Sequence, residues 1–189
     1  MQKQRLLLHC CCAPCASSVV ERLLKENKYE ITMYFSNSNI LPQEEYEKRK
    51  AEMVRLNQEI FTDTKLIIEE YSPSDYFDAI RGLEKLGEGS ARCDACIGYR
   101  MKNTAKYAKE NQFDVFATTL TVSPHKNANK INEIGEVLSQ EFGIEYMPSD
   151  FKKQNGYLRS IELCREYNIY RQKYCGCGLD LWNFRQKEI

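Results

Sequence analysis

The chain has 189 residues, and its 27 Lys and Arg residues balance 27 Asp and Glu residues, so the formal net charge is zero. Hydrophobic residues make up 42% and charged residues 29%. This composition argues against a disordered chain and is typical of one globular domain. No apolar run approaches the roughly 20 residues that span a bilayer, and the N-terminus lacks the apolar region of a secretory signal. We therefore expect a cytoplasmic protein that does not act on membranes.

Predicted strands and helices alternate along the chain. Short apolar or β-branched runs predict strands at residues 5–9, 29–35, 65–70, 113–120 and 144–147. Helical spacing of apolar residues and helix-end signals predict helices at residues 16–27, 42–58, 74–86, 99–110, 129–142 and 160–167. This alternation predicts an α/β fold with a parallel sheet. We expect a single domain over residues 1–189, with a core over 1–150 and a less regular, cysteine-containing extension over 151–189 packed on the active-site edge.

Nine cysteines are the most unusual feature of the composition. Eight of them fall into three groups: Cys10, Cys11, Cys12 and Cys15; Cys93 and Cys96; and Cys175 and Cys177. Structural disulfides are rare in cytosolic proteins, so clustered cysteines there indicate metal or redox chemistry. The first group follows the first predicted strand, which places it at the sheet edge where α/β folds bind ligands. The ninth cysteine, Cys164, lies in a predicted helix and is interpreted as a core residue.

Each cysteine group admits more than one interpretation. The spacing of Cys12 and Cys15 also fits a thioredoxin-like dithiol. Two separated groups can supply four ligands to one metal or cluster, and a structural zinc or inert buried thiols are the alternatives. The pair Cys175 and Cys177 can close a strained, labile disulfide or complete a second metal site.

Two further stretches predict contacts with a substrate. Residues 118–127 follow the fourth predicted strand and include His125 and Lys126, which can contact substrate or transfer a proton, although the threonines there can simply cap the strand exit. Beyond residue 150, aromatic and basic residues are interleaved. That pattern suits stacking on unstacked RNA bases and contact with phosphates, although most of these aromatics can also be core residues. The chain has no glycine-rich phosphate loop, which argues against ATP or NAD as the main ligand.

The motifs are most informative in combination, at residues 6–15, 39–42, 45–46, 92–96, 118–127, 150–153 and 170–177. Together they resemble the QueH family of epoxyqueuosine reductases over essentially the whole chain. The resemblance implies a Rossmann-like (HUP-type) fold. It also implies the last step of queuosine biosynthesis, in which the epoxide of epoxyqueuosine in the wobble position of tRNA is reduced. The partners implied are a tRNA substrate and an electron donor that the sequence does not identify.

The resemblance also implies roles for individual residues. It implies a 4Fe-4S cluster held by Cys11, Cys12, Cys93 and Cys96, and a redox-active pair of Cys175 and Cys177. Cys10 stands where the family usually has another residue, so Cys10 and Cys15 stay open as ligands, as does an additional mononuclear iron.

The remaining roles are hypotheses about the proton and the RNA. We expect His125 or Asp94 to supply a proton. The residues expected to contact tRNA are Lys126, Lys152, Lys153, Arg171 and Lys173. The rival hypotheses are a zinc-binding protein that binds or thiolates tRNA, and a thiol–disulfide oxidoreductase that uses Cys12 and Cys15.

Overall fold

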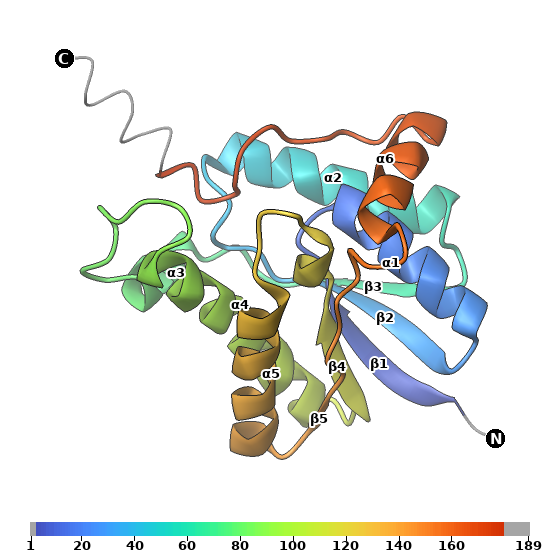
Figure 1. Cartoon of the computed structure of the whole chain (residues 1–189), viewed down its shortest axis with the longest axis horizontal. Helices are drawn as coiled ribbons and strands as arrows, with labels where there is room; N and C mark the ends of the chain where they lie inside the picture. The colour runs from blue at the N-terminus through green and yellow to red at the C-terminus, as the bar shows by residue number, and fades with distance from the viewer. Residues whose placement is uncertain (1–2, 180–189) are drawn as a thin grey trace.

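The computed structural model describes residues 3–179 and shows an α/β fold built on one five-stranded sheet (Figure 1). Every pair of neighbouring strands is parallel, and the strand order is β3-β2-β1-β4-β5. The strands are β1 (Gln4–His9), β2 (Tyr29–Phe35), β3 (Lys65–Ile68), β4 (Val115–Thr118) and β5 (Glu145–Tyr146). The predicted α/β class with a parallel, Rossmann-like sheet is confirmed. Residues 180–189 of the predicted C-terminal extension lie outside the described residues.

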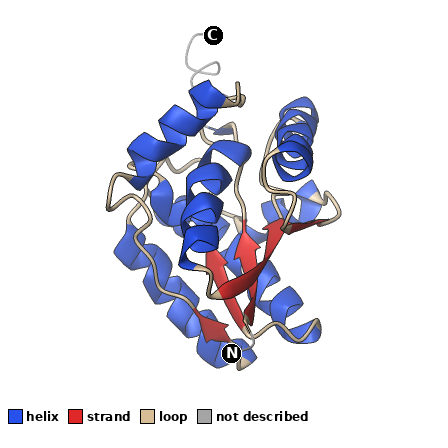
Figure 2. Cartoon of the chain, turned by 90° about the vertical axis from the view of Figure 1, so that its right-hand side faces the viewer, coloured by secondary structure: helices blue, strands red, loops and turns tan. Residues whose placement is uncertain are grey.

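Helices lie on both sides of the sheet, as Figure 2 shows. The helices are α1 (Ala13–Glu26), α2 (Gln43–Glu59), α3 (Pro73–Ala79), α4 (Ala91–Glu110), α5 (Ala128–Phe142) and α6 (Gly156–Glu166), with a short 3-10 helix, η1 (Thr119–Val122). No helix among residues 3–179 is both long enough and apolar enough to cross a membrane.

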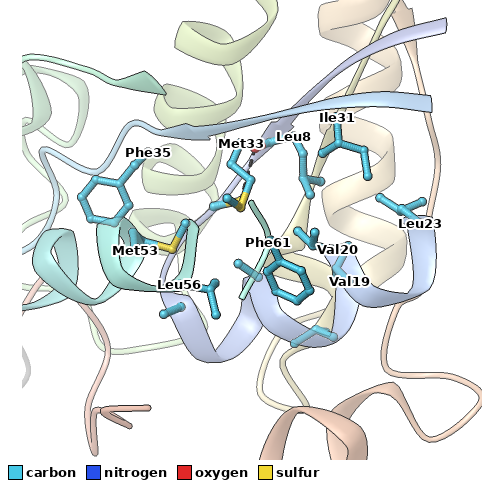
Figure 3. Close-up of a cluster of buried hydrophobic side chains, with 14 of the residues drawn as sticks. Leu8, Val19, Val20, Leu23, Ile31, Met33, Phe35, Met53, Leu56 and Phe61 are labelled. Atoms are coloured by element: carbon cyan, nitrogen blue, oxygen red, sulfur yellow. Dashed lines mark hydrogen bonds between the residues drawn. The ribbon is translucent and has the colours of Figure 1, made fainter. Parts of the chain in front are cut away.

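The core has two layers because side chains alternate along the central strand. Leu6 and Leu8 of β1 pack into one cluster with side chains of α1 and α2, whereas Leu7 packs into the other with side chains of α4 and α5. Figure 3 shows Leu8 and Met33 in the first cluster, together with side chains of α1 and α2. A strand that is buried on both faces explains the uninterrupted apolar run at the start of the chain. Cys164 belongs to the first cluster, so its predicted core role is confirmed.

Helix α1 begins at Ala13, three residues before the predicted start at Ala16. Pro14 stands in the first turn, where its missing N–H leaves no hydrogen bond unmade. Cys12 is therefore the residue that precedes the helix, and Cys15 lies in the first turn. The thiols of the first cysteine group sit around a helix N-terminus, which favours negative charge on sulfur.

Helix α4 begins at Ala91, whereas the prediction started it at residue 99. Ser90 caps the helix by accepting a hydrogen bond from the Arg92 backbone N–H at 3.3 Å. The predicted start is therefore wrong: Cys93 and Cys96, which precede the predicted helix, belong to the first turns of α4.

Other boundaries shift for local reasons. Helix α3 ends at Ala79 instead of reaching residue 86, and the chain then turns through Gly82, which has a φ of +83°. Helix α6 begins at Gly156 instead of residue 160. Strand β4 ends at Thr118 because the chain turns there into η1. None of these shifts changes the sheet or the edge at which its loops meet.

Candidate redox and metal site

The loops that follow β1 and β4 meet at the carboxyl edge of the sheet, where the strand order reverses. Such a reversal point is where open α/β sheets bind ligands. The backbone N–H of Cys11, after β1, donates to the Thr119 hydroxyl, after β4, at 3.3 Å. This contact brings the stretch after β4 to the same edge as the first cysteine group.

Three thiols gather at this edge. The Sγ atoms of Cys11, Cys12 and Cys15 all lie within 4.8 Å of one another, and those of Cys11 and Cys12 are 3.7 Å apart. Within residues 3–179, no other set of three His, Cys, Asp or Glu side chains brings its ligand atoms together in this way. Thiolate ligands select zinc, copper(I) or iron–sulfur clusters, so the donor chemistry of this group fits a metal or a cluster.

Hydrogen bonds among the three thiols shift their pKa values in opposite directions. Hydrogen bonds from Cys12 and then Cys15 lower the pKa of the Cys11 thiol well below its ordinary value. The same interactions with Cys11 raise the pKa values of Cys12 and Cys15. Two further donors reach these sulfurs: the Thr119 hydroxyl lies 3.6 Å from the Cys11 Sγ, and Gln172 Nε2 lies 3.1 Å from the Cys12 Sγ. The group therefore holds one thiolate that several donors stabilise.

Cys10 lies apart from this group. Its side chain is 0% exposed and belongs to the core cluster under α1. Its Sγ donates to the Leu8 carbonyl oxygen at 3.3 Å, and burial raises the pKa of its thiol well above the ordinary value. The structure does not bring Cys10 to the other three thiols.

A second sulfur group lies beside the first, in a cavity of about 330 Å³ that is lined by Cys93, Cys96, Cys175 and Cys177. Burial raises the pKa of Cys96. A hydrogen bond from Cys177 lowers the pKa of the Cys175 thiol to about 5, and the same interaction raises the pKa of Cys177. This cavity therefore presents a second thiolate, on Cys175, next to a thiol that can donate to it.

The two cavities share part of their lining. The first has a volume of about 400 Å³ and contains Cys11, Cys12 and Cys15. The residues that line both cavities are Glu88, Arg100, His125, Lys126 and Cys175. Burial alone lowers the pKa of Lys126, but the negative charges of Cys175 and Cys11 outweigh it and raise that pKa. Cys175 of the second sulfur group thus also lines the first cavity, near the cations Lys126 and Arg100.

The predicted proton donors occupy different positions. His125 is exposed and lines both cavities, whereas Asp94 lines the second cavity only.

Only some of the residues predicted to contact tRNA lie at the cavities. Lys126, Arg171 and Lys173 line the first cavity. Lys152 and Lys153 line neither cavity, and each instead lies 3.6 Å from a carboxylate oxygen of Asp150. The cavity therefore gathers only part of the predicted basic set.

Sequence reasoning missed three polar residues at this edge. Arg100 is buried and donates from Nη2 to the Asn37 Oδ1 at 2.7 Å, and Asn37 Nδ2 donates to the Cys10 carbonyl oxygen at 2.8 Å. The third is Gln172, which contacts Cys12. Asn37 could have been predicted, because it lies two residues after the end of β2 in a polar run. Arg100 and Gln172 carried no comparable signal, since each acts through a partner distant in sequence.

His9 ends β1 directly beneath the thiols. Its Nδ1 lies 2.9 Å from the Thr118 hydroxyl, and the ring is fully buried. Burial, followed by the nearby charge of Arg100, lowers the pKa of His9 to about 3. The imidazole is therefore neutral and ties β1 to β4 below the site.

Comparison with known proteins identifies relatives along nearly the whole chain. The family model described as epoxyqueuosine reductase QueH matches residues 6–181. The chain is 44% identical to epoxyqueuosine reductase QueH of Streptococcus pyogenes serotype M1 over 187 residues, which covers 93% of this chain and 72% of that protein. It is 32% identical to the QueH of Thermotoga maritima over 185 residues, which covers 96% of this chain and 93% of that protein. The chain belongs to the QueH family of epoxyqueuosine reductases.

Proposed function

We propose that this protein reduces the epoxide of epoxyqueuosine in the wobble position of tRNA and so completes queuosine biosynthesis, in the cytoplasm. The observation that carries the proposal is the pair of thiol-lined cavities that share Cys175, Arg100 and Lys126, in a chain of this family. The reaction takes up two electrons and two protons. Both C–O bonds of the epoxide break, a C=C bond forms, and the oxygen leaves as water.

We further propose that the protein holds a 4Fe-4S cluster through Cys11, Cys12, Cys93 and Cys96. The support is chemical: Cys11 is a stabilised thiolate with Cys12 beside it, and the pair on α4 lies in the adjoining cavity. When bound, such a cluster supplies electrons one at a time. Cys15 lies within the first group as well, so it competes with the α4 pair as a ligand to the cluster or to a separate iron.

The residues between the cavities have roles that follow from their charge. Lys126 and Arg100 stabilise the negative charge that develops on the oxygen as the C–O bonds break. His125 lines both cavities and reaches solvent, so it can deliver a proton to that oxygen. Cys175 and Cys177 can pass on two electrons by forming a disulfide, with release of two protons, and an external donor then reduces them again.

The substrate enters the first cavity, where Arg171 and Lys173 offer cationic side chains and Tyr157 and Tyr174 offer aromatic ones. Cations of this kind bind phosphates, and aromatic rings stack on unpaired bases. This combination supports an RNA loop with an extruded base as the ligand.

The test is a metal analysis followed by a turnover assay. Anaerobically purified protein should contain iron and acid-labile sulfide, and dithionite should bleach its visible absorption. With dithionite as the donor, it should convert epoxyqueuosine-containing tRNA to queuosine-containing tRNA, as measured by mass spectrometry of the nucleosides. Zinc without sulfide, or no conversion by iron-loaded protein, would refute the proposal.

The close approach of Cys12 and Cys15 favours one second candidate, a thiol–disulfide oxidoreductase. That activity requires no metal and no contribution from Cys93 or Cys96. A colourless, metal-free protein that reduces disulfides equally well after Cys93→Ser would support this candidate instead.

A further inference from the structure

Helix α2 and the loop before it hold the segment that carries Cys175 and Cys177. Figure 1 shows this red C-terminal segment running from α6 across α2. Arg55 Nη2 donates to the Tyr167 carbonyl oxygen at 3.1 Å, and a Glu52 carboxylate oxygen accepts the Tyr170 backbone N–H at 3.0 Å. The Leu41 backbone N–H donates to the carbonyl oxygen of Gly176 at 2.8 Å. These contacts fix the segment along its length, and the last of them reaches the Cys-Gly-Cys turn (residues 175–177).

A buried ion pair on α2, between Glu45 and Arg49, makes two further contacts with this segment. Arg49 Nε lies 2.7 Å from Glu45 Oε1, and the two side chains are only 5% and 9% exposed. Arg49 Nη2 also donates to the Tyr174 carbonyl oxygen at 3.5 Å, directly before the turn, and the Tyr170 hydroxyl donates to Glu45 Oε2 at 3.1 Å. Each charged residue therefore binds its partner on α2 and one point of the segment.

The turn is shaped to fit against this pair. A methyl group added at Gly176 would lie 3.1 Å from the Asn39 side-chain nitrogen, 3.1 Å from Ile40 Cγ1 and 3.3 Å from Arg49 Nη1. Contacts this short need the neighbours to move, so glycine allows the turn to approach Arg49. The Gly178 N–H then closes the turn on the Cys175 carbonyl oxygen at 3.3 Å.

We propose that Glu45 and Arg49 are positioning residues that hold the Cys-Gly-Cys turn at the wall between the two cavities. A buried ion pair contributes little net stability compared with an apolar pair of the same volume. Its directional hydrogen bonds to the segment therefore explain the presence of a buried ion pair here better than a contribution to folding stability does. The purpose of this positioning rests on the proposed function. The pair keeps Cys175 in the lining of both cavities and Cys177 in the lining of the second. Cys177 is only 5% exposed in the intact protein. Without the pair, the turn opens and Cys177 becomes accessible to solvent.

The test measures alkylation of single cysteines in reduced, anaerobic full-length protein, resolved by peptide mass spectrometry. In Arg49→Met and Glu45→Ala, alkylation of Cys177 should accelerate about tenfold or more, because the turn opens locally. Glu45→Gln keeps an acceptor for Tyr170 and should show a smaller increase. The control is Arg159→Met, which removes a more exposed Arg–Glu pair between α6 and α1, with Arg159 Nη2 2.8 Å from Glu21 Oε1. Neither of these two residues lines a cavity.

Two buried thiols elsewhere report on global unfolding within the same sample. Cys10 and Cys164, at 0% and 4% exposure, should react at the wild-type rate in every variant. An unchanged Cys177 rate in Arg49→Met, or equal acceleration of all three thiols, would overturn the proposal. Wild-type protein that fails to reduce epoxyqueuosine would refute the proposed function instead, and the alkylation comparison would still decide the positioning.

Discussion

Gln172 and Cys12 lie 160 positions apart in the chain, yet the Gln172 side-chain amide donates to the Cys12 Sγ at 3.1 Å. This contact joins the segment after α6 to the residue that precedes α1. It gives one thiol of the first group a donor from a different part of the chain. The sulfur environment is therefore completed only when the C-terminal segment folds onto the sheet edge.

Gln172→Leu should weaken metal binding at the first thiol group about tenfold or more. Cys12 is a thiolate when it binds a metal, and a hydrogen bond to a charged group contributes about 1.5–3 kcal/mol. Competition with a chelator, followed by iron or zinc analysis, measures this loss. The neighbouring Lys173→Met is the matched control. Lys173 lines the first cavity, so its loss should weaken tRNA binding and lower the salt dependence of that binding without changing metal affinity. Equal metal affinity in Gln172→Leu and wild type would show that the contact does not support the site.

Alkylation of Cys175 should already be close to its maximal rate at neutral pH. The hydrogen bond from Cys177 lowers the pKa of Cys175 to about 5, so its reactive thiolate predominates above that pH and is lost as the pH falls below it. Cys177→Ala removes the donor and should return this pKa toward its ordinary value. The rate at pH 7 should then fall about tenfold or more, while Cys93 in the same protein reacts as before. A rate that Cys177→Ala leaves unchanged would contradict the hydrogen bond as the cause.

Cys10→Ala should retain the full content of iron and sulfide, because the Cys10 side chain lies in the core and donates to the Leu8 carbonyl oxygen. The cost should be about 1 kcal/mol of folding stability, from the lost sulfur packing and hydrogen bond. Cys11→Ala removes the stabilised thiolate and should abolish metal binding. Elemental analysis and denaturant unfolding of both variants make the comparison. Loss of iron in Cys10→Ala would mean that the loop rearranges to use Cys10 as a ligand.

The sequence was sufficient to predict the sheet because its strands are apolar, β-branched or aromatic runs separated by helical patterns. The grouping of Cys11 and Cys12 with Thr119 also followed from topology, since the carboxyl ends of parallel strands share one edge. The start of α4 did not, because the stretch after Ser90 mixes small, charged and thiol side chains without clear helical spacing. The capping serine, Ser90, is the one signal there for a helix start.

The polar residues that complete the site were harder to predict. Arg100 lies on a predicted helix, but its partner Asn37 is 63 positions away in the chain. Gln172 and Cys12 are separated by even more of the chain, 160 positions. Local patterns carry no information about such pairs, because they depend on how the helix packs on the sheet and how the C-terminal segment returns. Three-dimensional structure was required to find them.

Gly135→Ala should destabilise the protein, although alanine normally favours a helix. A Cβ at Gly135 in α5 would lie 2.3 Å from the ring of Tyr146. That ring is fixed by its hydroxyl, which donates to Asn132 Oδ1 at 2.9 Å, and by packing on Phe116 with the ring centroids 5.0 Å apart. Overpacking of this kind costs about 1–3 kcal/mol, which exceeds the roughly 1 kcal/mol gained from helix propensity.

Gly98→Ala in α4 is the matched control for Gly135→Ala, because an added Cβ there would meet no atom within 4 Å apart from its chain neighbours and the helix's own backbone. It should stabilise the protein by about 0.5–1 kcal/mol. Urea unfolding of both variants, and of Gly135→Ala combined with Tyr146→Leu, separates the two contributions. Shortening Tyr146 removes the clash, so alanine at Gly135 should cost less in the Tyr146→Leu background than in the wild type. If alanine cost the same in both backgrounds, the clash with Tyr146 would not be what requires glycine between α5 and β5.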